Sequence, residues 1–240
     1  MMRTISLNRS KWAVAIAALV PSLVFVPRAH AAADDVASLY GPQPPANASY
    51  LRVLNASSQA AHVALAGSEA PQTVAPGAVT RFSVLTQGTG ARVSVDGKVL
   101  ADAGAANPSA HAGDAVTVAL SHDAKGWHAT WVVGRYERAD GLKATLRAFN
   151  FAPGCSAKIS VDGNGPIVFA QIATGAQDAR TINPVSAKLV GLCGAAAASA
   201  ALPLPTLSAG DSYSVFVTGD AHRPVLTGAL DTLAWPPAAK

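Results

Sequence analysis

One short phrase occurs twice in this chain, and it constrains the fold more than any other feature of the sequence. The stretch LRVLNAS at residues 51–57 returns as LRAFNFA at residues 146–152. Further matches follow both copies in the same order, which indicates a duplicated unit. The matching segments are YLRVLNAS (50–57) and ATLRAFNFA (144–152), AHVALAG (61–67) and AKISVDG (157–163), TVAPGAVTRFSV (73–84) and QIATGAQDARTI (171–182), ARVSVDGKVL (91–100) and AKLVGLCG (187–194), and HAGDAVTVAL (111–120) and LSAGDSYSVFV (207–217).

The repeated segments have the pattern of β-strands. Apolar and polar residues alternate along them with a period of two, as they do in half-buried strands. Asp-Gly pairs at 96–97 and 162–163 favour hairpin turns. No convincing amphipathic helix follows the N-terminal region; the Ala-rich stretch 191–202 favours a loop, with a short helix as the alternative. The sequence therefore predicts an all-β fold of two tandem antiparallel β-sandwich domains.

The N-terminal region has the pattern of a secretory signal peptide. Basic residues precede an apolar run over residues 12–26, and a small-residue A-x-A site ends at Ala31. The apolar run is shorter than the roughly 20 residues that span a bilayer, which argues against a membrane anchor. We expect residues 1–31 to be a signal peptide cleaved near Ala31, and the chain to be exported to the periplasm.

The rest of the chain divides into three parts. Residues 32–49 are Pro-rich and are expected to form an extended lead-in. The two copies of the repeat then place one β-sandwich domain at 50–137 and another at 138–240. Each is close to the usual size of a two-sheet sandwich.

The charge balance argues against a nucleic-acid-binding protein. The chain has 18 Lys and Arg against 14 Asp and Glu, but four of the basic residues and none of the acidic ones lie in residues 1–31. The remainder carries no basic excess and no Lys/Arg cluster. It therefore lacks the electrostatic footprint that nucleic-acid binding requires.

Two cysteines, Cys155 and Cys193, are the only ones in the sequence. An even count in an exported protein favours a disulfide. A redox or nucleophilic pair would normally show a C-x-x-C spacing or a neighbouring histidine, and neither is present. We predict a structural disulfide between them.

A Gly-Asp-Ser block ending at Ser212 is the sharpest catalytic candidate, because it resembles the nucleophile block of SGNH-type esterases. The first copy of the repeat reads Gly-Asp-Ala at the same place, with Asp114 before Ala115. The aspartate is therefore expected to serve turn geometry, and the serine is dispensable. The required late D-x-x-H is also missing, since Asp220-Ala-His222 is one residue short. We predict no catalytic residue and expect that the chain is not an enzyme.

Histidines and aromatic residues give weaker signals. The densest group of metal-ligating residue types is His122, Asp123 and His128. Their pattern indicates exposed turn residues, so we predict no metal site and no cofactor.

Trp127, Trp131 and Tyr136 share one strand-like segment. They form a candidate surface for a polysaccharide or a protein partner, with packing in a core as the alternative.

The segment SLYGPQPPANASYLRVLNASSQ at 38–59 resembles the start of the mature AlgF family. Matching positions are Leu39, Tyr40, Gly41, Pro42, Arg52, Val53, Asn55 and Ala56. The resemblance implies a non-catalytic periplasmic accessory protein for O-acetylation of an exopolysaccharide, alginate or a related polymer such as cellulose. It implies contacts with a periplasmic SGNH-like acetyltransferase and a membrane-bound O-acyltransferase. The alternative is a polysaccharide-binding β-sandwich protein of the cell envelope.

Overall fold

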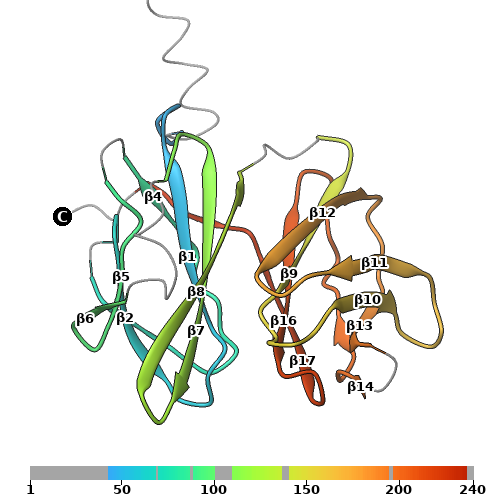
Figure 1. The fold of residues 1–240 in the computed structure, drawn as a ribbon. Coiled ribbons are helices and arrows are strands. Elements are labelled where there is room, and N and C mark those ends of the chain that lie inside the picture. Colours follow the sequence, from blue (N-terminus) through green and yellow to red (C-terminus); the bar gives the residue numbers. More distant parts are fainter. Residues whose placement is uncertain are drawn as a thin grey trace, which may run out of the picture. The chain divides into compact units, whose positions relative to one another are not determined.

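Every regular element in the described part of the protein is a β-strand, so the all-β prediction is confirmed (Figure 1). The signal peptide predicted at 1–31, most of the lead-in and the boundary predicted between 137 and 138 lie outside the described residues. The described part contains no helix that could cross a membrane. The computed structural model describes residues 43–68, 70–86, 89–100, 110–136, 141–194 and 197–236.

The first half of the chain contributes eight strands to two sheets. One sheet has the order β18-β4-β1-β7-β8, in which β18 comes from the end of the chain, and the other has the order β3-β2-β5-β6. The strands are β1 (Ser49–Asn55), β2 (Ala61–Leu65), β3 (Gln72–Val74), β4 (Phe82–Leu85), β5 (Val93–Val95), β6 (Lys98–Leu100), β7 (Asp114–Asp123) and β8 (Gly126–Arg135).

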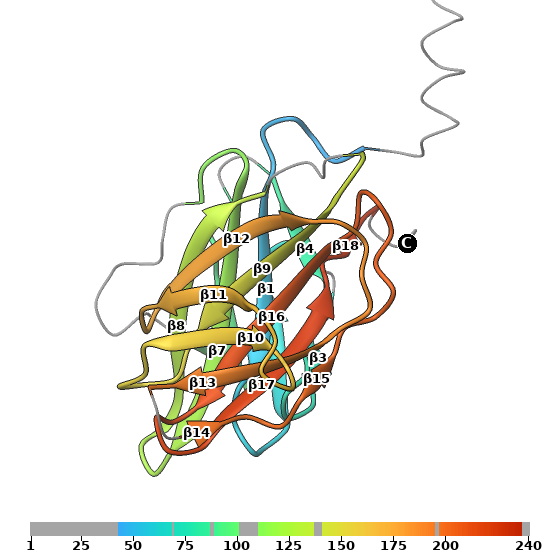
Figure 2. The ribbon, with the colours of Figure 1, turned by 90° about the vertical axis from the view of Figure 1, so that its right-hand side faces the viewer.

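The second half repeats this pairing pattern. One sheet has the order β12-β9-β16-β17, and the other has β11-β10-β13-β14, with β15 also paired to β13 (Figure 2). Strand β9 thus corresponds to β1, β12 to β4, β16 to β7 and β17 to β8. The strands are β9 (Ala144–Asn150), β10 (Ala157–Val161), β11 (Ile167–Ile172), β12 (Ala176–Ile182), β13 (Lys188–Cys193), β14 (Ala197–Ala198), β15 (Leu202–Pro203), β16 (Ser212–Gly219), β17 (Pro224–Leu230) and β18 (Leu233–Ala234).

The repeated Asn has the same role in both halves. The side-chain amide of Asn55, at the end of β1, donates to the carbonyls of Gln59 and Val74. The amide of Asn150, at the end of β9, donates to the carbonyls of Cys155 and Ile172. Both asparagine side chains are fully buried, and each donates to two backbone carbonyls of the loops around it. This shared role explains why the phrase ends in Asn twice.

Each half pairs its first strand in parallel with a later one, which differs from the prediction of purely antiparallel sheets. Strand β1 pairs in parallel with β7, and β9 pairs in parallel with β16. The prediction of half-buried strands is also wrong for these four strands, since nearly all of their residues are buried. One face of each covers the core of its own half, and the other face contacts the other half.

Three hydrophobic clusters follow from this arrangement. One is built from the first half and contains Leu51, Val53 and Trp131, and another is built from the second half and contains Leu146 and Ile159. A third, smaller cluster combines both halves, and its buried members are Leu54, Ala119, Val132, Phe149 and Phe216. Residues 42–240 form one compact unit, and the two-domain division stays a prediction.

The last strand crosses from the second half to the first. After β17 ends at Leu230, β18 pairs in parallel with β4 and becomes the edge of that sheet, and the amide of Phe82 donates to the carbonyl of Thr232 at 2.8 Å. The crossing segment begins with Asp231, whose carboxylate is the centre of the site described next.

Candidate functional site

A buried polar cluster lies where the outer faces of the two repeats meet. We call it the arginine–aspartate cluster, and its members are Arg52, Arg147, Ser212, Ser214 and Asp231. The two arginines occupy the same position in the repeated phrase, one on β1 and one on β9. The serines come from β16, and Asp231 comes from the segment that crosses to β18.

Arg52 is fully enclosed, and each of its three guanidinium nitrogens donates a hydrogen bond. Its guanidinium donates to Asp231 Oδ1 at 2.5 Å, to Ser214 Oγ at 2.7 Å and to Thr117 Oγ1 at 3.0 Å. The rings of Phe82, Phe149 and Phe216 lie around it, with centroids 4.2, 5.3 and 5.0 Å from its Cζ. Burial lowers the pKa of this guanidinium, and Asp231 opposes that shift.

Asp231 is the carboxylate that holds the cluster together. Its side chain is only 3% exposed, and it accepts hydrogen bonds from Arg52, from Ser212 Oγ at 2.7 Å and from Ser214 Oγ at 2.7 Å. The Nε of Arg147 lies 3.6 Å from Asp231 Oδ2. A buried carboxylate needs this many donors, because an unpaired charge in the interior is very costly.

Arg147 makes fewer hydrogen bonds than Arg52, the arginine at the same position of the first repeat. Its Nη1 donates to the backbone carbonyl of Arg135 at 2.8 Å, and its Nε lies 3.4 Å from Ser212 Oγ. Its side chain is 9% exposed. One edge of this guanidinium therefore borders a cavity.

The cavity has a volume of about 520 Å³ and is lined by members of the cluster together with aromatic and backbone groups. Tyr50 and Tyr136 stack on one of its sides, with ring centroids 4.1 Å apart. Burial raises the pKa of Tyr136, and the neighbouring Tyr50 adds to the shift. Arg147, Ser212 and Asp231 supply its polar lining.

Comparison with known protein families identifies the family of this chain. The model of the family described as "Alginate O-acetyl transferase AlgF" matches residues 22–211, which is well over half of the sequence. The chain belongs to the AlgF family. This membership ties the protein to alginate acetylation.

Solved structures give further matches. The C-terminal domain of AlgF from P. aeruginosa is 23% identical, covers 37% of this chain and 98% of its own length, and has a TM-score of 0.31. A family CBM26 module, CBMbc from Eubacterium rectale Amy13K in complex with maltoheptaose, is 13% identical, covers 80% of this chain and 100% of its own, and has a TM-score of 0.27. A search of curated proteins found no match.

The Gly-Asp-Ser block of this AlgF-family chain forms a turn, as predicted from the repeat. Asp211 Oδ2 accepts the amide of Ser208 at 2.7 Å, and Asp114 Oδ2 accepts the amide of His111 at 2.8 Å in the first half. The same contact over three residues thus occurs in both copies. Ser212 donates its hydroxyl to Asp231, and no histidine is among the residues that line the cavity.

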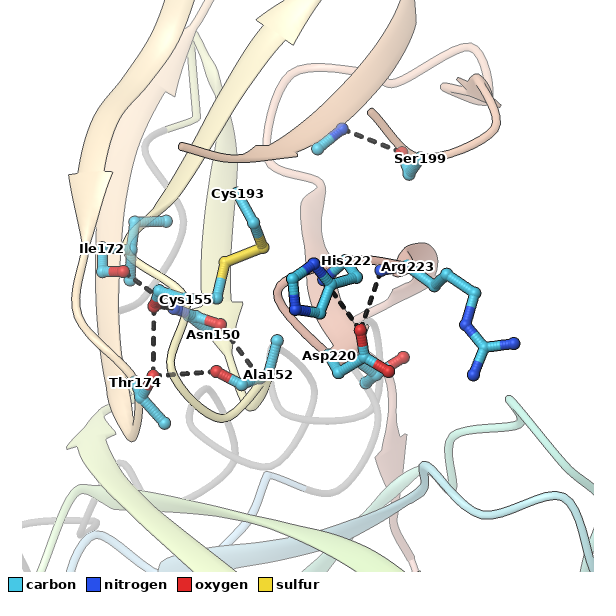
Figure 3. The surroundings of a disulfide bond; sticks show 12 residues. Asn150, Ala152, Cys155, Ile172, Thr174, Cys193, Ser199, Asp220, His222 and Arg223 are labelled. Atoms are coloured by element: carbon cyan, nitrogen blue, oxygen red, sulfur yellow. Dashed lines mark hydrogen bonds between the residues drawn. A yellow bond between two sulfur atoms is a disulfide. The ribbon is translucent and has the colours of Figure 1, made fainter. Parts of the chain in front are cut away.

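The Asp220–His222 segment also forms a turn. Asp220 Oδ1 accepts the backbone amides of His222 at 2.7 Å and Arg223 at 2.9 Å, in the loop between β16 and β17 (Figure 3). These bonds lower the pKa of Asp220. The carboxylate therefore accepts the backbone amide of His222 and shapes this turn.

The three aromatic residues singled out in the sequence lie in different surroundings. Trp131 is buried in the core of the first half, and its indole N–H has no hydrogen-bond partner in the described part of the chain. Trp127 packs against the same core and donates to Asp96 at 3.2 Å. Tyr136 lies apart from both, stacked on Tyr50. Trp131 thus packs as the core alternative describes, and a binding role for Trp127 or Tyr136 stays a prediction.

The His122, Asp123 and His128 group lies on the β7–β8 hairpin. His128 Nε2 is 2.9 Å from Asp123 Oδ1, and His122 packs edge-on to Trp127. The hydrogen bond from His128 lowers the pKa of Asp123. No group of three or more metal-ligating side chains is found among the described residues.

The predicted disulfide between Cys155 and Cys193 is confirmed, with their Cα atoms 5.2 Å apart (Figure 3). It connects the loop after β9 to the end of β13. The carbonyl of Cys155 also accepts hydrogen bonds from Asn150 and from Thr174 Oγ1 at 3.0 Å. The disulfide therefore reinforces the loop that the repeated Asn organises.

Sequence reasoning missed the arginine–aspartate cluster. The signal was present in the repeated phrase, because Arg52 and Arg147 each interrupt an otherwise apolar strand at the same place. A charged residue kept in both copies of a buried strand indicates an internal partner. The identity of that partner, Asp231, had no local signal, since it lies 179 positions from Arg52.

Proposed function

We propose that this protein is a non-catalytic periplasmic accessory protein for O-acetylation of alginate or a related exopolysaccharide such as cellulose. In this role it contacts a periplasmic SGNH-like acetyltransferase and a membrane-bound O-acyltransferase, and its surfaces bring them together. Membership of the AlgF family carries the link to alginate acetylation. The adaptor role is what the resemblance to this family implies, and we adopt it as part of the proposal.

The surroundings of Ser212 support a role without catalysis. Acyl transfer through a serine needs a base within hydrogen-bond reach and donors for the developing oxyanion. The hydroxyl of Ser212 instead donates to Asp231, whose carboxylate is already occupied by Arg52 and Ser214. These contacts give the serine a structural use and leave it no imidazole partner among the residues around the cavity.

Two measurements test this proposal. Purified protein should hydrolyse a chromogenic acetate no faster than its Ser212→Ala variant, with Ser208→Ala, an exposed serine of the same turn, as the matched control. The immobilised protein should also retain the purified acetyltransferase partners. Hydrolysis that disappears only in Ser212→Ala would contradict the non-catalytic role, and failure to retain either partner would contradict the adaptor role.

A further inference from the structure

We propose that the cavity beside the arginine–aspartate cluster receives the guanidinium of an arginine side chain on a protein partner. The guanidinium bonds to the carboxylate of Asp211 and to the backbone carbonyl of Ala209, next to the Tyr50–Tyr136 stack. The choice of a protein as the source of this arginine rests on the proposed adaptor function. The choice of a guanidinium rests on a comparison of the two repeats.

The first repeat holds such a guanidinium within its own chain. The turn before β7 ends at Asp114, whose Oδ2 accepts the amide of His111. Arg135 Nη1 donates to Asp114 Oδ1 at 3.0 Å and to the carbonyl of Ala112 at 3.1 Å. The guanidinium lies over Gly113, because a Cβ added at that glycine would be 3.0 Å from Arg135 Nη2. A carboxylate, a carbonyl and a glycine thus form the site of one arginine.

The second repeat keeps the acceptors of this site. Asp211 Oδ2 accepts the amide of Ser208 in the same turn contact, and Ala209 and Gly210 repeat the Ala-Gly pair of the first turn. Neither Asp211 Oδ1 nor the carbonyl of Ala209 accepts a hydrogen bond from any residue that the structure describes. A Cβ added at Gly210 would meet no described atom within 4 Å. The place that the guanidinium occupies in the first repeat is therefore open in the second.

The strand register shows which residue replaces the arginine. In the first repeat, Arg135 of β8 lies opposite Asp114 of β7. Continuing the pairing of β16 with β17 past its last pair places Thr232 opposite Asp211. The second repeat thus has a threonine where the first has an arginine, and Thr232, Gly210 and Asp211 all line the cavity.

The charges that line the cavity favour a cation beside Asp211. They are the carboxylates of Asp211 and Asp231 and the guanidinium of Arg147. Asp231 and Arg147 face each other, with Oδ2 and Nε 3.6 Å apart. Asp211 is partly buried and forms no ion pair with any described residue. An ionised donor suits this carboxylate best, since charge-assisted hydrogen bonds are about twice as strong as neutral ones.

Tyr50 and Tyr136 provide a surface for a flat cation. Their stacked rings line the same cavity as Asp211. A planar guanidinium stacks on aromatic faces and is attracted to their π electrons, whereas a lysine ammonium is a compact, strongly hydrated charge. Arginine is also one of the residues that most often anchor protein interfaces. The cavity therefore fits an arginine anchor better than a lysine.

NMR titration of the protein with the peptide acetyl-Gly-Arg-Gly-amide tests the site, with acetyl-Gly-Gln-Gly-amide as the comparison peptide. We expect saturable shifts of the Gly210 and Asp211 amides with the arginine peptide only, and weaker binding as salt is raised. Asp211→Asn keeps an oxygen that accepts the Ser208 amide, and it should weaken binding about tenfold or more. Asp114→Asn is the matched control, because Arg135 already fills the first site, and it should leave binding unchanged.

Thr232→Arg tests the site from the opposite direction. The side chain of Thr232 is exposed, and its backbone carbonyl still accepts the amide of Phe82 after the substitution. The new guanidinium should fill the site from within the chain and abolish binding of the arginine peptide, whereas Thr232→Gln should leave binding unchanged. Undiminished binding by Thr232→Arg or Asp211→Asn would overturn the proposal. So would equal shifts with the glutamine peptide, or no shifts with the arginine peptide.

Retention of the purified acetyltransferase partners by the immobilised protein tests whether a partner supplies the arginine. Asp211→Asn and Thr232→Arg should each weaken retention of one partner about tenfold, and Asp114→Asn should not. Full retention of both partners by Asp211→Asn would overturn the assignment to a partner. Failure of the unmodified protein to retain either partner would overturn both the adaptor role and this source of the arginine, whereas the peptide titration decides the guanidinium site by itself.

Discussion

Replacing Asp231 by Asn should destabilise the protein more than any other single change within the arginine–aspartate cluster. The substitution keeps the shape of the side chain but removes the carboxylate that pairs with Arg52, whose side chain is 1% exposed. Removing one partner of a buried ion pair typically costs about 3–5 kcal/mol, because the remaining charge is left uncompensated. For a chain of this size, that loss lowers the melting temperature by roughly 10 °C.

Arg52→Met should cost less than Asp231→Asn. When Arg52 is removed, Asp231 keeps the hydroxyls of Ser212 and Ser214 and the neighbouring Arg147. When Asp231 is removed, two guanidiniums remain without a carboxylate. The contacts therefore predict that Asp231→Asn lowers the free energy of unfolding more than Arg52→Met does.

Urea denaturation followed by circular dichroism measures these costs. Asp178→Asn, on the exposed side of β12, is the matched control and should stay within about 0.5 kcal/mol of the unmodified protein. The double variant Arg52→Met/Asp231→Asn should be more stable than the sum of the single losses predicts, by about 1 kcal/mol or more. The reasoning is refuted if Asp231→Asn costs under about 1 kcal/mol, or if the two changes are additive.

Three further predictions concern other features of the fold. Asn150→Asp and Asn55→Asp should each lower the free energy of unfolding by about 2 kcal/mol or more. Each replaces a buried amide that donates to two carbonyls with a carboxylate that repels them. Equal stability of variant and unmodified protein in urea would contradict this. Reduction of Cys155–Cys193 should lower the free energy of unfolding by about 3–4 kcal/mol, since the disulfide closes a loop of 38 residues; unfolding curves with and without reductant give the difference. The raised pKa of Tyr136 means that the unfolded chain loses its phenolic proton first, so stability should fall as pH rises above about 10, and Tyr136→Phe should reduce that fall in denaturation measured between about pH 9 and 11.

The strands of the repeat could be predicted because their pattern is local. Alternation and turn residues placed strands at β1, β2, β9, β10 and β16 close to where they lie. The disulfide followed from a count of two cysteines. These signals depend on residues that are near in sequence or few in number, so no knowledge of the packing was needed.

The contact between the halves could not be predicted in the same way. Polar residues such as Arg52, Thr117 and Ser214 alternate with apolar ones, and alternation normally indicates a face in water. Here that polar face is buried, because the two repeats place such residues against each other and satisfy them mutually. Strand β18 is equally hidden from sequence reasoning, since two residues pair with a strand about 150 positions away.

The crossing of β18 has a consequence for the order in which the polypeptide is completed. The first half begins near Ser49, but its edge strand and the counter-ion of Arg52 come from Asp231 and Leu233–Ala234. Domains usually mature from the N-terminus as synthesis proceeds. In this protein the first half cannot pair Arg52 with Asp231, or add β18 to its sheet, until residues 231–234 have been synthesised.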